Sequence, residues 1–483
     1  MKFEDIAQLC FVLKKTSKKL LKVQLLIDFS KLIPPKEAVE LYDVLSGNFA
    51  REISKKDVGV SLQSTFQVLS SYYEVPLSSI KNSFFKHGDI FLTVQEFDVQ
   101  KSTLKLTKPL MFKEFVETFL QISQISGKNS AQFKKNKLLF LFSKTNSTLE
   151  RQILAAYIAD ILKIGTNEGI LHDVFIHLFF PRVQEFQHIS NSLQRVIVNR
   201  DIEEEYSRLL IENSSLHIIK NIFEFNYLDE TNLKKGIREI EYTELSSLVQ
   251  SSFPFSNIVI SNTFSKDEGR KIFNEIKSQF ELVYSFYTSY VTTFQVLSDS
   301  SKNFIRPIVI FNKPIQVMLG PRLYSFDEVK DKIQFPVFSD YKYDGLRLII
   351  QNKFGDVKLF SRNLENLTSQ FYEVVDFIKD NFSHLSCTLD AECVGFDAVT
   401  YQEVPFQELS KRIMTKSHNL KFKVIIGLRI FDILELENKQ LHLESLQYRQ
   451  QILRKMFLDN KIRIKKEFSS QFVKERLEYF FDS

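Results

Sequence analysis

The sequence predicts a multidomain chain, with an all-α N-terminal domain followed by an α+β domain built on antiparallel strands. Its 483 residues are too many for one core of ordinary size. From Phe3 to about Phe304, apolar residues recur mainly at helical spacing. Beyond Pro307 they begin to alternate with polar residues, as they do in half-buried strands. We therefore place the domain boundary near residue 306.

Helices of the N-terminal domain are indicated by apolar stripes on one face. After Thr148 such a stripe comprises Leu149, Ile153, Leu154, Tyr157, Ile158, Ile161 and Leu162. Gly165 follows it as the expected end of the helix. The segment from about 186 to 280 has no role that its residues reveal.

Strands of the second domain are indicated by period-two alternation. Leu346, Leu348 and Ile350 are followed by a turn at 353–356 and then by Val357 and Leu359, which predicts a β-hairpin. Further strands are expected at 388–394 and 424–431, and a helix around 371–378 separates them from the hairpin.

Composition and charge set limits on function. The 64 Lys and Arg exceed the 59 Asp and Glu by five, which permits a polyanionic partner without requiring one. Cys10, Cys387 and Cys393 offer neither a disulfide framework nor metal-ligand spacing, so we expect a reducing compartment and no structural zinc. No apolar stretch reaches bilayer length and none resembles a signal peptide. We expect an intracellular protein, cytoplasmic in a prokaryote or nuclear in a eukaryote, without membrane contact.

The pattern KxDGxR lies at the start of the predicted hairpin, within Asp340–Arg347. Strand alternation places Lys342 and Asp344 on the same side. Gly345 permits a close backbone approach, and Arg347 adds a nearby cation. A lysine in such surroundings can act as a nucleophile, although a solvated lysine in a hairpin is the plainer alternative.

Together with the segments that follow in order, this pattern resembles the covalent nucleotidyltransferases, and among them the ATP-dependent DNA ligases of archaeal and eukaryotic type. The resemblance implies that Lys342 becomes adenylylated. It also implies nucleotide contacts from the residues around it, which are Asp340, Tyr341, Asp344, Gly345 and Arg347. Asp340 stands where the family usually has a glutamate next to the adenine.

Three later segments continue the resemblance. Phe360–Glu365 is similar to the motif whose arginine contacts nucleotide or nick phosphate, which implies Arg362. Leu389–Glu392 implies that Glu392 contacts the ribose or a metal, taken as Mg²⁺. Strand alternation would place Asp390 beside it on one face, although an exposed acidic face is the alternative. Ile430–Leu434 implies that Phe431 stacks on adenine, whereas a phenylalanine that ends an apolar strand is otherwise core. Another similar segment, which connects these motifs, includes Pro405, Phe406, Gln407, Leu409 and Arg412.

The N-terminal region resembles the same ligases independently, through a lysine-rich helix and a turn. The resemblance implies a helical DNA-binding domain over 1–305 and a partial adenylation domain over 306–483. The candidate DNA contacts are Lys134, Lys135, Lys163 and Gly165. Such turns read phosphate and shape in the minor groove without sequence preference. Taken alone, the lysines of the helix would more often form a solvated face.

We therefore expect a monomeric ATP-dependent DNA ligase that uses ATP and Mg²⁺ to seal nicked duplex DNA through a lysine-AMP intermediate, in replication and repair. A sliding clamp is a further partner that the sequence does not specify. An RNA ligase or capping-type nucleotidyltransferase is the first alternative, against which the helical N-terminal region speaks. A non-catalytic DNA-binding protein is the second.

The chain ends at Ser483, whereas the family continues with an EGxxxK segment, a lysine pair and an OB-fold. On the resemblance, the adenylation domain is incomplete at its C-terminus and the OB-fold is absent. We predict that the 483-residue chain binds duplex DNA but does not seal a nick that is already adenylylated. Each missing electrostatic contact is worth ~10² to 10³ in rate. A gel assay for joined product tests this expectation, and measurable sealing would contradict it.

Overall fold

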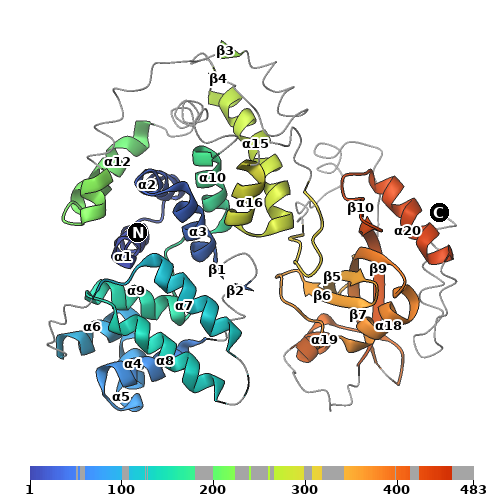
Figure 1. Ribbon diagram of the computed structural model, residues 1–483, viewed down its shortest axis with the longest axis horizontal. Coiled ribbons are helices and arrows are strands. Elements are labelled where there is room, and N and C mark those ends of the chain that lie inside the picture. Colours follow the sequence, from blue (N-terminus) through green and yellow to red (C-terminus); the bar gives the residue numbers. More distant parts are fainter. Residues whose placement is uncertain are drawn as a thin grey trace. The chain divides into compact units, whose positions relative to one another are not determined.

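The structure, a computed structural model, divides into two compact units (Figure 1). The first comprises Met1–Tyr284 and Ser289–Arg306, and the second comprises Ser285–Thr288 and Pro307–Ser483. The residues that the structure describes are 1–49, 53–54, 60–100, 108–125, 127, 129–179, 200–222, 239–240, 259–260, 266–298, 307–317, 342–397, 399–413 and 424–459.

The first unit is helical, as predicted. Its helices are α1 (Phe3–Lys14), α2 (Lys19–Lys31), α3 (Pro35–Ser46), α4 (Leu62–Tyr73), α5 (Leu77–His87), α6 (Ile90–Gln100), α7 (Phe112–Gln124), α8 (Ser130–Ser143), α9 (Thr148–Ile158), α10 (Glu168–Phe179), α12 (Arg200–Glu212), α15 (Lys266–Tyr287) and α16 (Tyr290–Ser298). The unit also contains two pairs of two-residue strands. These are β1 (Asn48–Phe49) with β2 (Ile53–Ser54) and β3 (Glu239–Ile240) with β4 (Val259–Ile260). Among the described helices of both units, none has the length and apolar character needed to cross a membrane.

Helix α9 ends earlier than the apolar stripe predicts. Asp160 adopts a left-handed φ of 59°, and the Ile161 amide donates to the Ala156 carbonyl at 3.0 Å. This bond pattern closes the helix C-terminus in a Schellman motif. Ile161 and Leu162 therefore lie beyond the helix, and Gly165 belongs to the connection to α10 rather than to the helix end.

The second unit is built on an antiparallel sheet with the strand order β10-β9-β7-β5-β6, and β8 pairs with β7. Its elements are β5 (Leu346–Lys353), β6 (Asp356–Ser361), α18 (Tyr372–Phe382), β7 (Ser386–Asp397), β8 (Glu403–Val404), α19 (Phe406–Ile413), β9 (Val424–Leu436), β10 (Lys439–Gln440) and α20 (Leu446–Asp459). The predicted hairpin is confirmed as β5 and β6. Phe354 and Gly355 form its two-residue turn with φ values of 50° and 90°, which suits the twist of the strands.

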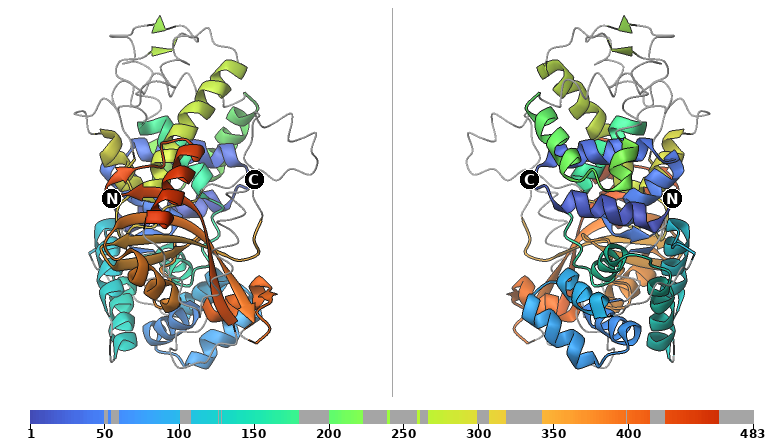
Figure 2. Two further views of the ribbon diagram at one scale, coloured as in Figure 1. Left: turned by 90° about the vertical axis from the view of Figure 1, so that its right-hand side faces the viewer. Right: turned by 90° about the vertical axis from the view of Figure 1, so that its left-hand side faces the viewer.

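One face of this sheet carries the core of the second unit. Leu348, Leu389 and Ala391 are fully buried there, against side chains of α18 and α20 such as Ile378 and Leu453. Figure 2 shows α20, in red, lying along the sheet. Because side chains alternate along a strand, the intervening residues of β5 and β7 lie on the opposite face, which leaves that face for a polar site.

We predict a pH dependence in the first unit from His177 on α10, which is 3% exposed. Burial lowers the pKa of His177 to about 4, Asp173 acts in the opposite direction, and Lys31 lowers it slightly further. The unfolded chain therefore binds more protons below the ordinary histidine pKa of ~6.5. Stability from this group is complete above that pH and is lost as the pH falls toward 4. Between pH 7.5 and pH 5 the loss should be about 2 kcal/mol.

The measurement is urea unfolding at both pH values for the unmodified chain and for His177→Leu. The pH-dependent loss should be smaller in the variant by about the same amount. His384→Leu, at an exposed position, is the matched control. An equal loss in His177→Leu and in the unmodified chain would show that His177 titrates normally.

Candidate active site

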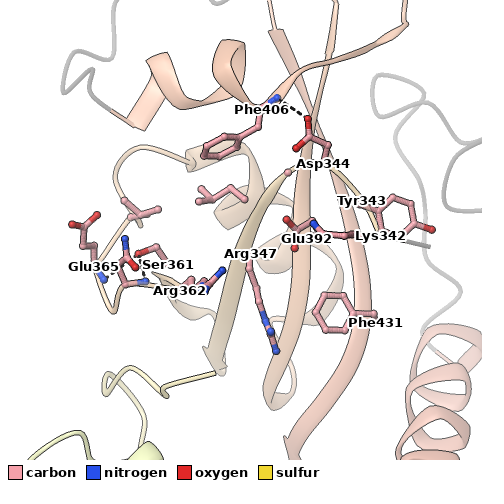
Figure 3. Close-up of a pocket in the computed structure, with 14 residues that line it drawn as sticks. Lys342, Tyr343, Asp344, Arg347, Ser361, Arg362, Glu365, Glu392, Phe406 and Phe431 are labelled. Atoms are coloured by element: carbon pink, nitrogen blue, oxygen red, sulfur yellow. Dashed lines mark hydrogen bonds between the residues drawn. The ribbon is translucent and has the colours of Figure 1, made fainter. Parts of the chain in front are cut away.

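A pocket of about 760 Å³ opens on the polar face of the second unit's sheet. Seven residues that we predicted for the nucleotide site line it: Lys342, Asp344, Gly345, Arg347, Arg362, Glu392 and Phe431. Figure 3 shows the side chains of all of these except the glycine. Asp340 and Tyr341 lie outside the described residues. The structure thus brings together residues spread over 90 positions of the sequence.

Lys342 lies in the segment that leads into β5 and is exposed. The strand begins at Leu346, so our use of strand alternation for Lys342 and Asp344 was wrong. Both residues nevertheless line the pocket. Within the described residues Lys342 forms no hydrogen bond or ion pair, although its charge acts to lower the pKa of Glu392.

Gly345 allows the segment that carries Lys342 to lie directly on β7. A Cβ at this position would be 2.4 Å from the Cys393 carbonyl oxygen and 2.9 Å from Glu392 Cγ. The φ of Gly345 is not in the left-handed region, so the need for glycine here is one of space. The backbone at Gly345 therefore lies close to β7, beside Glu392, the candidate metal-binding carboxylate.

Asp344 links this segment to the start of α19. Its Oδ2 accepts a hydrogen bond from the Phe406 amide at 3.3 Å, which satisfies an otherwise unpaired donor in the first turn of the helix. Phe406 itself lines the pocket. We had placed it only in a connecting segment, because that segment gave no reason to expect contact with the site.

Arg347 is held by Asp390 through two parallel hydrogen bonds, Nε to Oδ1 at 2.9 Å and Nη2 to Oδ2 at 2.5 Å. Asp390 is 4% exposed, and burial raises its pKa although the Arg347 guanidinium acts to lower it. Asp390 and Glu392 share a face of β7, as alternation predicts. The two carboxylates differ in their contacts: Asp390 is hydrogen-bonded to Arg347, whereas Glu392 lines the pocket.

Phe431 lies at a β-bulge in β9. Asp390 pairs with Asp432 and Ala391 with Ile430, which leaves Phe431 without a partner on β7. A bulge re-aims side chains, and here Phe431 lines the pocket. The Arg347 guanidinium lies over its ring, with Cζ 5.4 Å from the ring centroid. The strand continues to Leu436, so our placement of Phe431 at the strand end was wrong.

Glu392 is half-buried, and its pKa is raised mainly by burial while Arg347 and Lys342 act to lower it. Among the described residues, no group of three or more His, Cys, Asp or Glu side chains could hold a metal ion. Mg²⁺ is commonly held by one or two carboxylates together with substrate phosphates and water. Glu392, as a single carboxylate that lines the pocket, fits that pattern.

Arg362 is carried by a turn that Ser361 organises. Ser361 Oγ accepts hydrogen bonds from the amides of Asn363 and Glu365, both at 3.2 Å. The Arg362 side chain is exposed and makes no hydrogen bond or ion pair with the described residues. Sequence reasoning missed further lining residues, namely Tyr343, Leu346, Ser361, Asn363, Glu365, Leu367 and Phe406. Several of these residues lie inside the motifs, so their position next to the predicted site residues could have indicated that they line the pocket.

The candidate DNA contacts belong to the first unit. Lys134 and Lys135 lie on α8, which packs against α4 and α7. Lys163 and Gly165 are exposed in the connection between α9 and α10.

Comparison with known proteins identifies the family. The family model "DNA ligase N terminus" matches residues 2–176, and the model "ATP dependent DNA ligase domain" matches residues 317–482. The chain belongs to the ATP-dependent DNA ligase family. All the residues that line the pocket lie within the range that the second family model matches.

Curated relatives agree with this assignment. The chain is 24% identical to the DNA ligase of Nanoarchaeum equitans, over 94% of this chain and 64% of the relative. It is 22% identical to that of Methanocella arvoryzae, over 90% and 61%, and 23% identical to the probable DNA ligase of Persephonella marina, over 94% and 62%. The chain thus spans about three fifths of the length of these relatives.

We predict that Gly345→Ala destabilises the second unit by about 1–3 kcal/mol, because the added methyl group overpacks against the β7 backbone. Gly169→Ala is the control, since its Cβ would meet only Asn167 Oδ1 at 3.5 Å in the first turn of α10. This control should change stability by less than about 1 kcal/mol. Urea unfolding measures both, and equal effects would contradict the close approach at Gly345.

Proposed function

We propose that the pocket binds ATP and that Lys342 accepts its adenylyl group, as the first step of DNA ligation. The observation that carries the proposal is the position of Lys342. This lysine has no ion-pair partner among the described residues, and it lines the same pocket as two arginines, three carboxylates and three aromatic rings. Such a pocket suits a substrate with an aromatic base at one end and a triphosphate at the other.

ATP fits the pocket in size and chemistry. A volume of about 760 Å³ lies in the usual range for small-molecule sites. The ring of Phe431 offers a surface for the adenine, and the contacts that distinguish adenine from other bases would come from Asp340 and Tyr341. The cations of Arg347 and Arg362 would lie near the phosphates, where charge-assisted hydrogen bonds are strong.

The transfer step follows from these positions. The Lys342 amine, after loss of its proton to solvent, attacks the α-phosphorus of ATP, a P–N bond forms, and the P–O bond to pyrophosphate breaks. Arg347 is held in place by Asp390, so its charge requires little reorganisation during the step. Glu392 would bind the ribose or hold Mg²⁺. When bound, Mg²⁺ would neutralise charge on the phosphates.

For the whole protein we propose the sealing of nicked duplex DNA in replication and repair. The adenylyl group passes from Lys342 to the 5′-phosphate at the nick, and the 3′-hydroxyl then displaces AMP to join the strands. The helical first unit, with Lys134, Lys135, Lys163 and Gly165, would bind the duplex. The family assignment and the chemistry of the pocket support this proposal.

We predict that labelled ATP transfers AMP to the whole protein in the presence of Mg²⁺ and that Lys342→Ala abolishes the label. Lys342→Arg should abolish it as well, because the charge is kept but the nucleophilic amine is lost. Lys353→Ala, at the far end of β5, is the matched control and should retain the label. Labelled protein after denaturing electrophoresis is the measurement.

Label that persists in Lys342→Ala would show that another residue is the nucleophile. Binding of duplex DNA by an unmodified chain that takes up no label would instead favour a non-catalytic DNA-binding protein. The two outcomes are distinguished by running the DNA-binding assay on the same preparations.

A further inference from the structure

The connection between α9 and α10 forms a turn whose residues alternate between interior and solvent. Ile164 is 4% exposed, whereas Lys163, Gly165 and Asn167 are exposed. Asn167 Oδ1 accepts from the Ile170 amide at 3.0 Å and so begins α10. The turn thus presents one lysine and the backbone before a helix N-terminus to the surface.

Lys22 of α2 supports this turn from the inside. The Lys22 side chain is 4% exposed, and its Nζ donates a hydrogen bond to the Ile164 carbonyl oxygen. A Cβ at position 165 would lie 2.2 Å from Lys22 Nζ, and Gly165 has a left-handed φ of +66°. Only glycine allows the ammonium group to lie directly against the backbone here. Helices α2 and α10, which flank this site, pack together (Figure 1).

The charge of Lys22 has no carboxylate partner within the described residues. Other lysines of α2 are paired, Lys19 with Asp173 at 2.6 Å and Lys31 with Asp28 at 4.0 Å. Burial lowers the pKa of Lys22, and no neighbouring charge contributes to its shift. A buried cation without an anion is costly. The position therefore favours an anion that comes from outside the chain.

The hydrogen-bonding groups around Lys22 indicate what kind of anion would fit. The first amides of a helix have no partner within the helix and attract anions. Thr166 Oγ1, between Gly165 and Asn167, is buried and has no hydrogen-bond partner in the described part of the chain. The exposed Lys163 adds a second cation. A phosphate group with several acceptor oxygens matches this set of donors.

We propose that Lys22 is a positioning residue for DNA binding, which holds the Lys163–Asn167 turn and places positive charge beneath Gly165, so that the turn binds a backbone phosphate of duplex DNA. This inference rests on the proposed binding of DNA by the first unit. Lys22 acts through the turn, whereas Lys163 and the turn backbone make the direct contacts.

The test compares the full chain with Lys22→Met, which keeps the length of the side chain but removes its charge and hydrogen bonds. Fluorescence anisotropy with a labelled nicked duplex gives the affinity at several salt concentrations between about 50 and 200 mM. We expect Lys22→Met to bind about tenfold more weakly, as expected for loss of one charge-assisted interaction. The slope of log affinity against log salt should fall by roughly one. The melting temperature shows whether the variant remains folded.

Lys19→Met is the matched control, because Lys19 lies on the same helix and its charge is already paired with Asp173. Its salt slope should equal that of the unmodified chain. If Lys22→Met does not fold, Lys22→Gln provides the same comparison with a shorter polar side chain.

Three outcomes would overturn the inference in different ways. A folded Lys22 variant with unchanged affinity and salt slope would show that Lys22 only supports the fold. An equal change in Lys19→Met would indicate a general charge effect. No salt-dependent binding by the unmodified chain would remove the proposed DNA-binding function itself, and the role of Lys22 with it.

Discussion

The pairing of β7 with β5 and β9 sets the positions of Arg347, Glu392 and Phe431 in the pocket. Arg347 of β5 and Arg429 of β9 both pair with Glu392, so one row of the sheet carries a carboxylate between two arginines. A shift of one residue in the β5–β7 register would turn Glu392 into the core and bring Ala391 or Cys393 to the pocket. Gly345 holds this register in place, because its lack of a side chain lets the approach to β5 contact the Cys393 carbonyl.

The sequence was sufficient for those parts of the fold that local alternation decides. The hairpin and the two long strands were predicted, although β7 and β9 each extend beyond the predicted ends. The bulge at Phe431 could not be predicted from alternation, since it depends on how β9 pairs with β7. In the first unit, the end of α9 was missed because Asp160, rather than a glycine, adopts the left-handed conformation.

The candidate site was predicted through motifs, and the interactions within it were not. The motifs gave Lys342, Glu392 and Phe431 as candidates, and the pocket contains all three. The pairing of Arg347 with Asp390 depends on a diagonal contact between two strands that lie 43 positions apart. The burial of Lys22 is likewise a result of helix packing, because its side chain lies against a turn 142 positions away. Residue type and spacing do not encode such distant contacts.

The two faces of β7 place different demands on its side chains. Core positions such as Leu389 and Ala391 require apolar groups of suitable volume, and cores accept compensating exchanges among aliphatic residues. Polar positions on the other face, such as Asp390 and Glu392, depend on chemical identity and on the direction of hydrogen bonds. Alternate residues of one strand can therefore diverge at different rates during evolution. An overall identity of only 24% to a ligase relative is then compatible with an unchanged pocket, since most substitutions can accumulate where only volume and polarity are selected.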